Sequence, residues 1–178
     1  MPKKEDILNA TFVKEVLIIE TSDFARELNN QSCFGNLEGN NLTISLMEGL
    51  FLLEKGKLKV VDGRKKIIER DKYFKKAIKV EPNFKTRYKV FKDLRDRGYI
   101  VKTALKFGAD FRVYDRGIKP GEDHAKWVVF PVTEGGTMTW QEFSAKNRVA
   151  HSTKKKLLMG IVDDENDVTY YEISWVRP

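Results

Sequence analysis

Two residues able to exchange protons with a substrate occur where predicted strands meet loops. Tyr114 ends the apolar segment Phe111–Tyr114, and His124 lies just before a second apolar segment, residues 127–130. Side chains at strand ends are held by a rigid sheet and still reach solvent, and catalytic groups are often carried there. A phenolic hydroxyl and an imidazole can act as general base and general acid. Each also has a structural explanation, as an amphipathic sheet-edge tyrosine and an exposed loop histidine.

Other residues compete for the same chemistry. His151 is the second of the two histidines in the chain, and Lys155 lies in a run of three lysines, Lys154–Lys156. An ammonium group can stabilise negative charge that develops on a substrate, but a run of lysines is usually a solvated basic face. The residues alone leave open which histidine and which lysine take part.

The segments around these residues have the periodicity of a helix followed by strands. Apolar residues at 84, 88, 91 and 94 fall at helical spacing, and Gly98 follows where a glycine commonly ends a helix. A capping box of Thr139 and Glu142 predicts a further helix, and residues 157–162 and 168–171 predict two strands joined by an acidic turn. Three short apolar segments predict the strands between the helices: Tyr99–Val101, Phe111–Tyr114 and Trp127–Phe130.

The first part of the chain predicts a separate set of elements. A capping box of Ser45 and Glu48 begins the clearest helix, which runs to Gly56. Between Asn30 and Ser45 we expect a Gly- and Asn-rich connection. The other expected elements are strands at residues 12–13, 16–19 and 58–61, and helices from Ser22–Asp23 to Asn29–Asn30 and from Arg70 to Lys79.

These elements predict two domains with a boundary at Glu81–Pro82. Residues 1–82 are expected to form an α+β domain, and residues 83–178 a domain in which a mixed sheet is flanked by helices. A chain of 178 residues is long enough to bury a sizeable core in either arrangement.

Composition narrows the classes of partner. The net charge of +7 favours a polyanion such as nucleic acid, and the excess of basic over acidic residues is two in residues 1–84 and five in residues 85–178.

One cysteine and two histidines cannot build the usual Cys/His zinc site. No apolar run approaches the ~20 residues needed to span a bilayer, and the charged N-terminus lacks the pattern of a secretory signal. We therefore expect a cytoplasmic protein.

Three long segments resemble the archaeal tRNA-splicing endonucleases: CFGNLEGNNLTISLMEGLFLLEKGKLKV, RGYIVKTALKFGADFRVYDRG and RVAHSTKKKLLMGIVD. The resemblance covers essentially the whole chain and implies that the C-terminal domain is the α/β nuclease domain of that family. It also implies excision of introns from precursor tRNA at bulge-helix-bulge splice sites. Attack by the RNA 2′-hydroxyl, without a metal or other cofactor, would leave a 2′,3′-cyclic phosphate and a 5′-hydroxyl. Positions matching the family pattern are Tyr114, His124 and Lys155, as base, acid and stabiliser of phosphate charge.

The resemblance also suggests RNA-binding and assembly residues. Family members pinch a bulged nucleotide between two side chains, here Arg148 and Trp175, which could instead be a salt-bridging arginine and a core tryptophan. Further RNA contacts are expected from Arg112, Arg116 and Lys126. The acidic turn, which is a solvated hairpin tip by composition alone, corresponds to a family loop that joins two dimers into a homotetramer; its acidic residues are Asp163, Asp164, Glu165 and Asp167.

Two alternatives remain at the level of the sequence. One is a metal-dependent nuclease in which Asp110 and Glu122, with Lys126 beside them, hold a divalent ion. The other is a non-catalytic RNA-binding subunit of a heteromeric splicing endonuclease, although such a subunit would be expected to lack part of the Tyr–His–Lys set.

Overall fold

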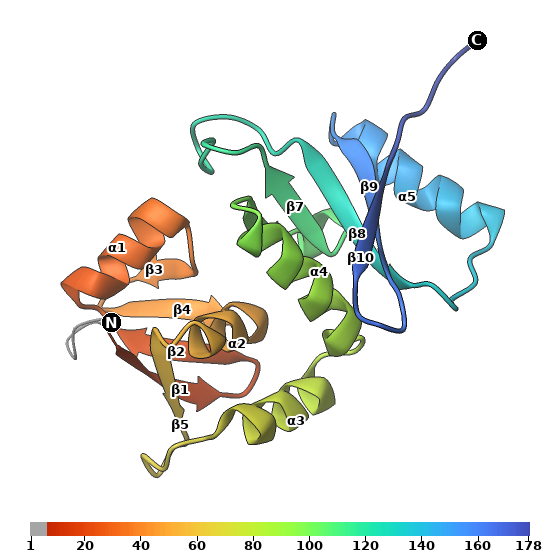
Figure 1. Ribbon diagram of the computed structural model, residues 1–178. Helices are drawn as coiled ribbons and strands as arrows, with labels where there is room; N and C mark the ends of the chain where they lie inside the picture. Colours follow the sequence, from red (N-terminus) through yellow and green to blue (C-terminus); the bar gives the residue numbers. More distant parts are fainter. Residues whose placement is uncertain (1–6) are drawn as a thin grey trace. The chain divides into compact units, whose positions relative to one another are not determined.

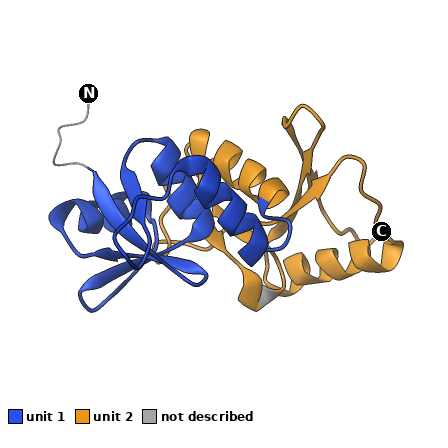
Figure 2. Ribbon diagram, turned by 90° about the horizontal axis from the view of Figure 1, so that it is seen from below, with its two compact units in different colours: residues 1–84 blue, residues 85–178 orange. Residues whose placement is uncertain are grey.

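A computed structural model describes residues 7–178 and, within them, every side chain except that of Phe107. The chain divides into two compact units, one ending at Phe84 and one running from Lys85 to Pro178 (Figure 2). None of the helices in the described residues is long and apolar enough to cross a bilayer.

Unit 1 is built on a five-stranded mixed sheet in the order β3-β4-β2-β1-β5 (Figure 1). Strands β1 and β5 run parallel, and the other neighbours are antiparallel. Alternate apolar residues of the strands are buried because helices cover one face of the sheet. The elements are β1 (Leu8–Val13), β2 (Val16–Glu20), α1 (Asp23–Ser32), β3 (Asn36–Glu38), β4 (Asn41–Ser45), α2 (Leu46–Glu54), β5 (Leu58–Val61) and α3 (Arg70–Val80).

Helix α2 is the centre of unit 1. The predicted capping box is present, because the Ser45 hydroxyl accepts from the Glu48 backbone N–H and the Glu48 carboxylate accepts from that of Ser45. Gly49 lets α2 approach its neighbours closely: a Cβ at this position would lie 2.3 Å from Leu17 and 2.7 Å from the hydroxyl of Tyr73. That hydroxyl is buried and donates to the Leu46 carbonyl at 2.8 Å. Unit 1 therefore tolerates little change of volume here.

Two expectations for unit 1 were wrong. The segment expected as a connection before Ser45 contains the hairpin of β3 and β4, and β4 lies inside the sheet between β3 and β2. Its Leu42 and Ile44 alternate with polar residues and are fully buried, which is the pattern of a strand with one covered face. Helix α1 continues past Asn29–Asn30 to Ser32, and Cys33 ends it in the left-handed conformation.

Unit 2 has a second mixed sheet, in the order β10-β9-β8-β7-β6. Strands β8 and β9 are parallel and connected through helix α5, while the other pairs are antiparallel. The expected α+β and mixed-sheet architecture is confirmed. The elements are α4 (Phe84–Asp96), β6 (Ile100–Thr103), the 3-10 helix η1 (Leu105–Phe107), β7 (Phe111–Tyr114), β8 (Trp127–Thr133), α5 (Trp140–Ser152), β9 (Lys156–Val162) and β10 (Val168–Ile173).

Helices cover both faces of this sheet (Figure 1). On one face the Phe91 ring of α4 lies tilted against the Phe111 ring of β7, with ring centroids 6.0 Å apart. The apolar residues of α4 at positions 84, 88, 91 and 94 are all buried and belong to the core. On the other face α5 closes a cluster that includes Ala150, Val128 and Leu157. The helices on its two faces therefore hold the strands of this sheet, and the ends of those strands, in position.

Candidate active site

Tyr114, His124 and Lys155 line one open cavity of about 420 Å³ in unit 2, here called the triad cavity. They come from three segments: the end of β7, the loop between β7 and β8, and the residue just before β9. The fold thus brings together three groups that are far apart in the sequence. The other lining residues are Arg112, Gly121, Glu122, Asp123 and Ala125.

Strand β7 supplies two neighbouring side chains to this cavity. Arg112 and Tyr114 are two residues apart, so they lie on the same face of the sheet. The Arg112 guanidinium is 6.0 Å from the centroid of the Tyr114 ring. Tyr114 is almost fully buried and pairs with Ile100 of β6. The tyrosine is therefore held rigidly, with a cation beside it.

The loop that carries His124 is closed at its base. The Lys126 ammonium is 2.9 Å from the Asp115 carboxylate, and this hydrogen bond lowers the pKa of Asp115 and raises that of Lys126. The backbone N–H of Lys126 donates to the Val113 carbonyl, and its carbonyl accepts from Lys156 N–H at 3.0 Å. His124 is exposed on this loop, and its backbone N–H donates to the Asp123 carboxylate at 2.6 Å.

The geometry separates the three consecutive lysines. Lys154 has a left-handed backbone (φ 54°) and an exposed side chain. Lys156 begins β9 and pairs with Glu172 at 2.6 Å, which lowers the pKa of that carboxyl. Lys155 is half-buried, lines the triad cavity and donates its ammonium to the Thr153 carbonyl at 2.9 Å. Of the three, Lys155 is the one that borders the cavity with Tyr114 and His124.

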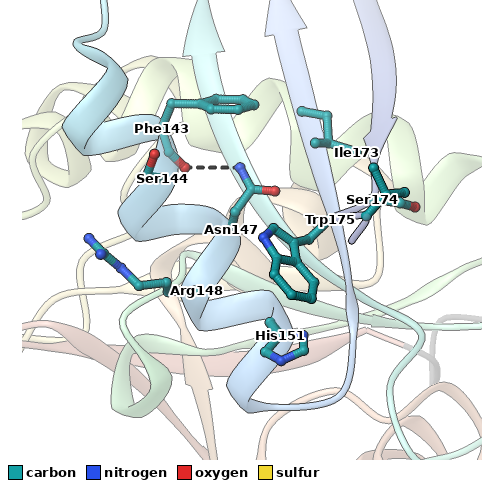
Figure 3. A pocket seen from close by; sticks show the side chains of 9 residues that line it. Phe143, Ser144, Asn147, Arg148, His151, Ile173, Ser174 and Trp175 are labelled. Atoms are coloured by element: carbon teal, nitrogen blue, oxygen red, sulfur yellow. Dashed lines mark hydrogen bonds between the residues drawn. The ribbon is translucent and has the colours of Figure 1, made fainter. Parts of the chain in front are cut away.

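His151 lies at a different place, in a second cavity of about 580 Å³ between α5 and the chain after β10 (Figure 3). Arg148 and Trp175, the residues suggested for base stacking, line this second cavity too. The His151 and Trp175 rings are 5.1 Å apart. Trp175 is 61% exposed and not a core residue. In Figure 3 the Arg148 side chain points away from the indole, so the two do not enclose a base-sized slot in this conformation.

Arg116 and Lys126 do not line the triad cavity. The Arg116 guanidinium lies 4.9 Å from the ring centroid of Tyr99, and the Lys126 ammonium lies 4.4 Å from that of Trp127. The two rings meet edge to face at 5.7 Å. Sequence reasoning did not single out Tyr99 and Trp127 as site residues. The sequence did contain a sign of their position, because each is an aromatic residue that begins a segment expected as a strand.

The three residues of the metal-dependent alternative have separate local partners. Asp110 pairs with Arg87 at 2.7 Å, although burial raises the pKa of this carboxyl. Lys126 pairs with Asp115, and the Glu122 carboxylate accepts from the Lys119 backbone N–H at 2.9 Å. Across residues 7–178, there is no group of three or more histidine, cysteine or acidic side chains suited to hold a metal ion.

The acidic turn is the tip of the β9–β10 hairpin. Asp163 holds the turn together, because its carboxylate accepts from the Asp167 N–H at 2.8 Å and its carbonyl accepts from Asn166. Asp164 and Glu165 are exposed at the tip. The four acidic residues therefore divide into one that builds the turn and others that are available to a partner.

Comparison with known proteins matches both units. A family described as tRNA intron endonuclease, N-terminal domain, matches residues 8–73, and one described as tRNA intron endonuclease, catalytic C-terminal domain, matches residues 84–170. Similar curated proteins are named tRNA-splicing endonuclease. That of Nanoarchaeum equitans is 45% identical over 81% of this chain and 99% of its own length. That of Methanothermobacter thermautotrophicus is 40% identical over 92% and 95%, and that of Thermococcus onnurineus is 43% identical over 85% and 86%.

Proposed function

This chain belongs to the tRNA intron endonuclease family and is an RNA endonuclease, and we propose that it excises introns by cutting precursor tRNA at bulge-helix-bulge splice sites. The products are RNA ends with a 2′,3′-cyclic phosphate and a 5′-hydroxyl. The bulge-helix-bulge is recognised by its shape, as is usual for proteins that bind folded RNA. We expect the reaction to take place in the cytoplasm.

The observation that carries this proposal is the meeting of Tyr114, His124 and Lys155 in one cavity of the unit that matches the catalytic domain. Tyr114, starting as the phenolate, takes the proton from the 2′-hydroxyl, and the 2′-oxygen attacks the adjacent phosphorus. The bond from phosphorus to the 5′-oxygen breaks, and His124, starting as the imidazolium, gives that oxygen a proton. Lys155 stabilises the extra negative charge on the non-bridging oxygens. Every proton is supplied or accepted by a side chain, so the sequence of steps balances without a metal ion.

Arg112 is placed to bind the substrate beside the triad. It lines the same cavity and its guanidinium lies 6.0 Å from the centroid of the Tyr114 ring. A guanidinium can bind a phosphate with two hydrogen bonds. We propose that Arg112 holds the scissile phosphate next to Tyr114.

Other contacts to RNA are proposed outside the triad cavity. Trp175 offers an exposed indole on which an unpaired base can stack, and Arg148 can turn toward it from α5. Arg116 and Lys126 flank the Tyr99–Trp127 pair and can contact phosphates there. Because the Lys126 ammonium is paired with Asp115, it contacts a phosphate either beside that pair or in its place.

The proposed assembly is a homotetramer, a dimer of dimers. A precursor tRNA has two cleavage sites in fixed geometry and one chain holds one triad, so a symmetric oligomer is the simplest arrangement. The exposed acidic tip of the β9–β10 hairpin supplies a contact between dimers, because carboxylates close to an RNA-binding surface repel the substrate unless a basic partner covers them.

The test is cleavage of a bulge-helix-bulge transcript by the purified protein. Wild type is expected to cut at both exon–intron junctions. Tyr114→Phe removes one oxygen atom from the triad cavity and should lower the rate of the cleavage step by about 10² or more. Tyr171→Phe makes the same change at an exposed tyrosine of β10 and should leave the rate unchanged. Equal rates for the two variants would remove Tyr114 from the mechanism, and intact RNA with wild type would refute the function.

A further inference from the structure

Positive charge is concentrated in one segment of unit 1. Residues 57–79 contain ten basic and three acidic residues, an excess of seven that equals the net charge of the whole chain. The remainder of residues 1–84 contains five basic and ten acidic residues. Unit 1 is therefore strongly asymmetric in charge, although its overall excess is only two.

The first part of this segment is a rigid turn between β5 and α3. The Asp62 carboxylate accepts from the backbone N–H groups of Arg64 and Lys66 at 2.9 and 3.0 Å, and the Asp62 N–H donates to the Lys66 carbonyl. The Ile68 N–H donates to the Val60 carbonyl beyond it. The Asp62 carboxylate is thus engaged by hydrogen bonds from backbone N–H groups, and the side chains at 64, 65 and 66 are exposed.

The second part is one face of α3, the helix that follows this turn (Figure 1). Lys72, Lys75 and Lys79 are exposed and spaced by three and four residues, so they lie along the same side of the helix. Like charges at this spacing destabilise a helix. Arg70, at its start, is instead paired with Glu54 and Asp71.

We propose that this surface binds the phosphate backbone of double-stranded RNA in the precursor. It is called the basic face and consists of Arg64, Lys65, Lys66, Lys72, Lys75 and Lys79. This inference rests on the proposed function and adds a substrate contact made by residues of the N-terminal unit, none of which lines the triad cavity. Within residues 7–178, no ion pair involves these six side chains.

The shape of the basic face favours a nucleic acid over a compact acidic partner. From Lys72 to Lys79 the helix rises by about 10 Å, and the turn that precedes α3 in the sequence carries three more exposed cations. A row of exposed cations matches a polymer with regularly spaced negative charges, and such contacts bind without reading sequence. The acidic tip of a second copy is smaller, with Asp164 and Glu165 next to each other in a tight turn. That tip is the rival occupant that the experiment must exclude.

The experiment measures RNA binding against monovalent salt for the full-length protein and a bulge-helix-bulge RNA with long duplex arms. Lys72→Gln/Lys75→Gln/Lys79→Gln keeps good helix-forming residues in α3. Each lost phosphate contact lowers the slope of log K against log salt by roughly 0.7 to 0.9, so we expect the slope to fall by about 2 to 3. The loss should be the same for duplex arms of different sequence. Arg64→Gln/Lys66→Gln tests the turn independently and should lower the slope by about 1 to 2.

A matched control removes the same charge elsewhere. Lys14→Gln/Lys55→Gln/Lys106→Gln changes three exposed lysines outside the basic face and should leave the slope unchanged. The single-turnover cleavage rate at saturating protein should be the same for wild type and the Lys14→Gln/Lys55→Gln/Lys106→Gln control, and that rate reports on the proposed function separately. An unchanged slope in the α3 variant, or equal losses in the control, would overturn the basic face as an RNA contact. A halved mass of the α3 variant in light scattering would also overturn it, by assigning the surface to a second copy.

Discussion

The Asp115 carboxylate and the Lys126 ammonium lie 2.9 Å apart and join the two ends of the loop that carries His124. Asp115 directly follows β7, and Lys126 directly precedes β8. The pair therefore fixes the loop at its base, where a small change in angle would be amplified at His124. Sequence reasoning placed Lys126 among the RNA contacts, but in the structure its ammonium is engaged with Asp115.

Breaking this pair should impair catalysis more than binding. For Asp115→Asn we expect a several-fold lower single-turnover rate with nearly unchanged RNA affinity, because His124 is less well positioned. The pKa of Asp115 is lowered in the fold, so the pair is present above the usual carboxyl pKa and is lost as pH falls through the lowered value. The deficit of the variant relative to wild type should therefore shrink at acid pH. The exchange Asp115→Lys/Lys126→Asp should recover part of the rate. Weaker binding with an unchanged rate would mean that the pair serves RNA contact.

The two histidines should differ sharply. His124→Ala removes the proposed acid from an exposed loop and should lower the cleavage rate by about 10²–10⁴ while substrate binding persists. His151→Ala removes a ring beside Trp175 in the other cavity and should affect binding at most. Rates and affinities measured separately on the same transcript decide this, and a dead His151→Ala with an active His124→Ala would reverse the assignment.

The three lysines provide an internal control for charge. Lys155→Gln, Lys154→Gln and Lys156→Gln each remove one positive charge, but only Lys155 lines the triad cavity. We expect a loss of at least about tenfold in single-turnover rate for Lys155→Gln and smaller losses for the other two. If the rate of Lys154→Gln falls as far as that of Lys155→Gln, cleavage depends on the total positive charge near the triad cavity and not on one positioned ammonium.

Assembly can be tested at the exposed acidic tip. Asp164→Lys/Glu165→Lys should divide the proposed tetramer into dimers and reduce cleavage of precursor tRNA, with the triad unchanged. Asp163 is left in place because its carboxylate holds the turn. Light scattering gives the mass, and Glu15→Lys/Glu27→Lys, which makes the same charge change at two exposed acidic residues of unit 1, is the control. A variant that keeps a mass of four chains, or a monomeric wild type, would exclude the tip from assembly.

Unit 1 offers a prediction about stability. Tyr73→Phe leaves the buried Leu46 carbonyl without the hydroxyl that donates to it at 2.8 Å, and should lower the free energy of unfolding by about 1–3 kcal/mol. Burial raises the pKa of Tyr73, so the neutral form is favoured in the fold while the unfolded chain ionises near pH 10. Wild type should lose stability above that pH, and the variant should lose less. Denaturant titrations at neutral and alkaline pH measure both effects.

Much of the fold follows from local signals in the sequence. The capping boxes Ser45–Glu48 and Thr139–Glu142 begin helices as predicted, since their hydrogen bonds are local. The β3–β4 hairpin was missed because its glycine and asparagine residues resemble a loop, and its pairing with β2 is decided by tertiary packing.

In the site, too, some features could be predicted from the sequence and others depend on tertiary packing. The sequence and the family resemblance pointed to Tyr114, His124 and Lys155, and the structure places all three around one cavity. Neither the pair of Asp115 and Lys126 nor the separate location of His151 and Trp175 could be read from spacing. Such contacts join residues whose distance depends on how strands are ordered in the sheet.

The central claim is cleavage by side chains and the RNA 2′-hydroxyl alone. Its most direct test is single-turnover cleavage of a bulge-helix-bulge RNA, folded in monovalent salt with excess chelator, next to the same RNA with a 2′-deoxy nucleotide on the 5′ side of one splice site. We predict full-rate cleavage of the unmodified RNA to a 2′,3′-cyclic phosphate and no cut at the deoxy position. Cleavage that requires added magnesium, or a cut at the deoxy position, would contradict the mechanism.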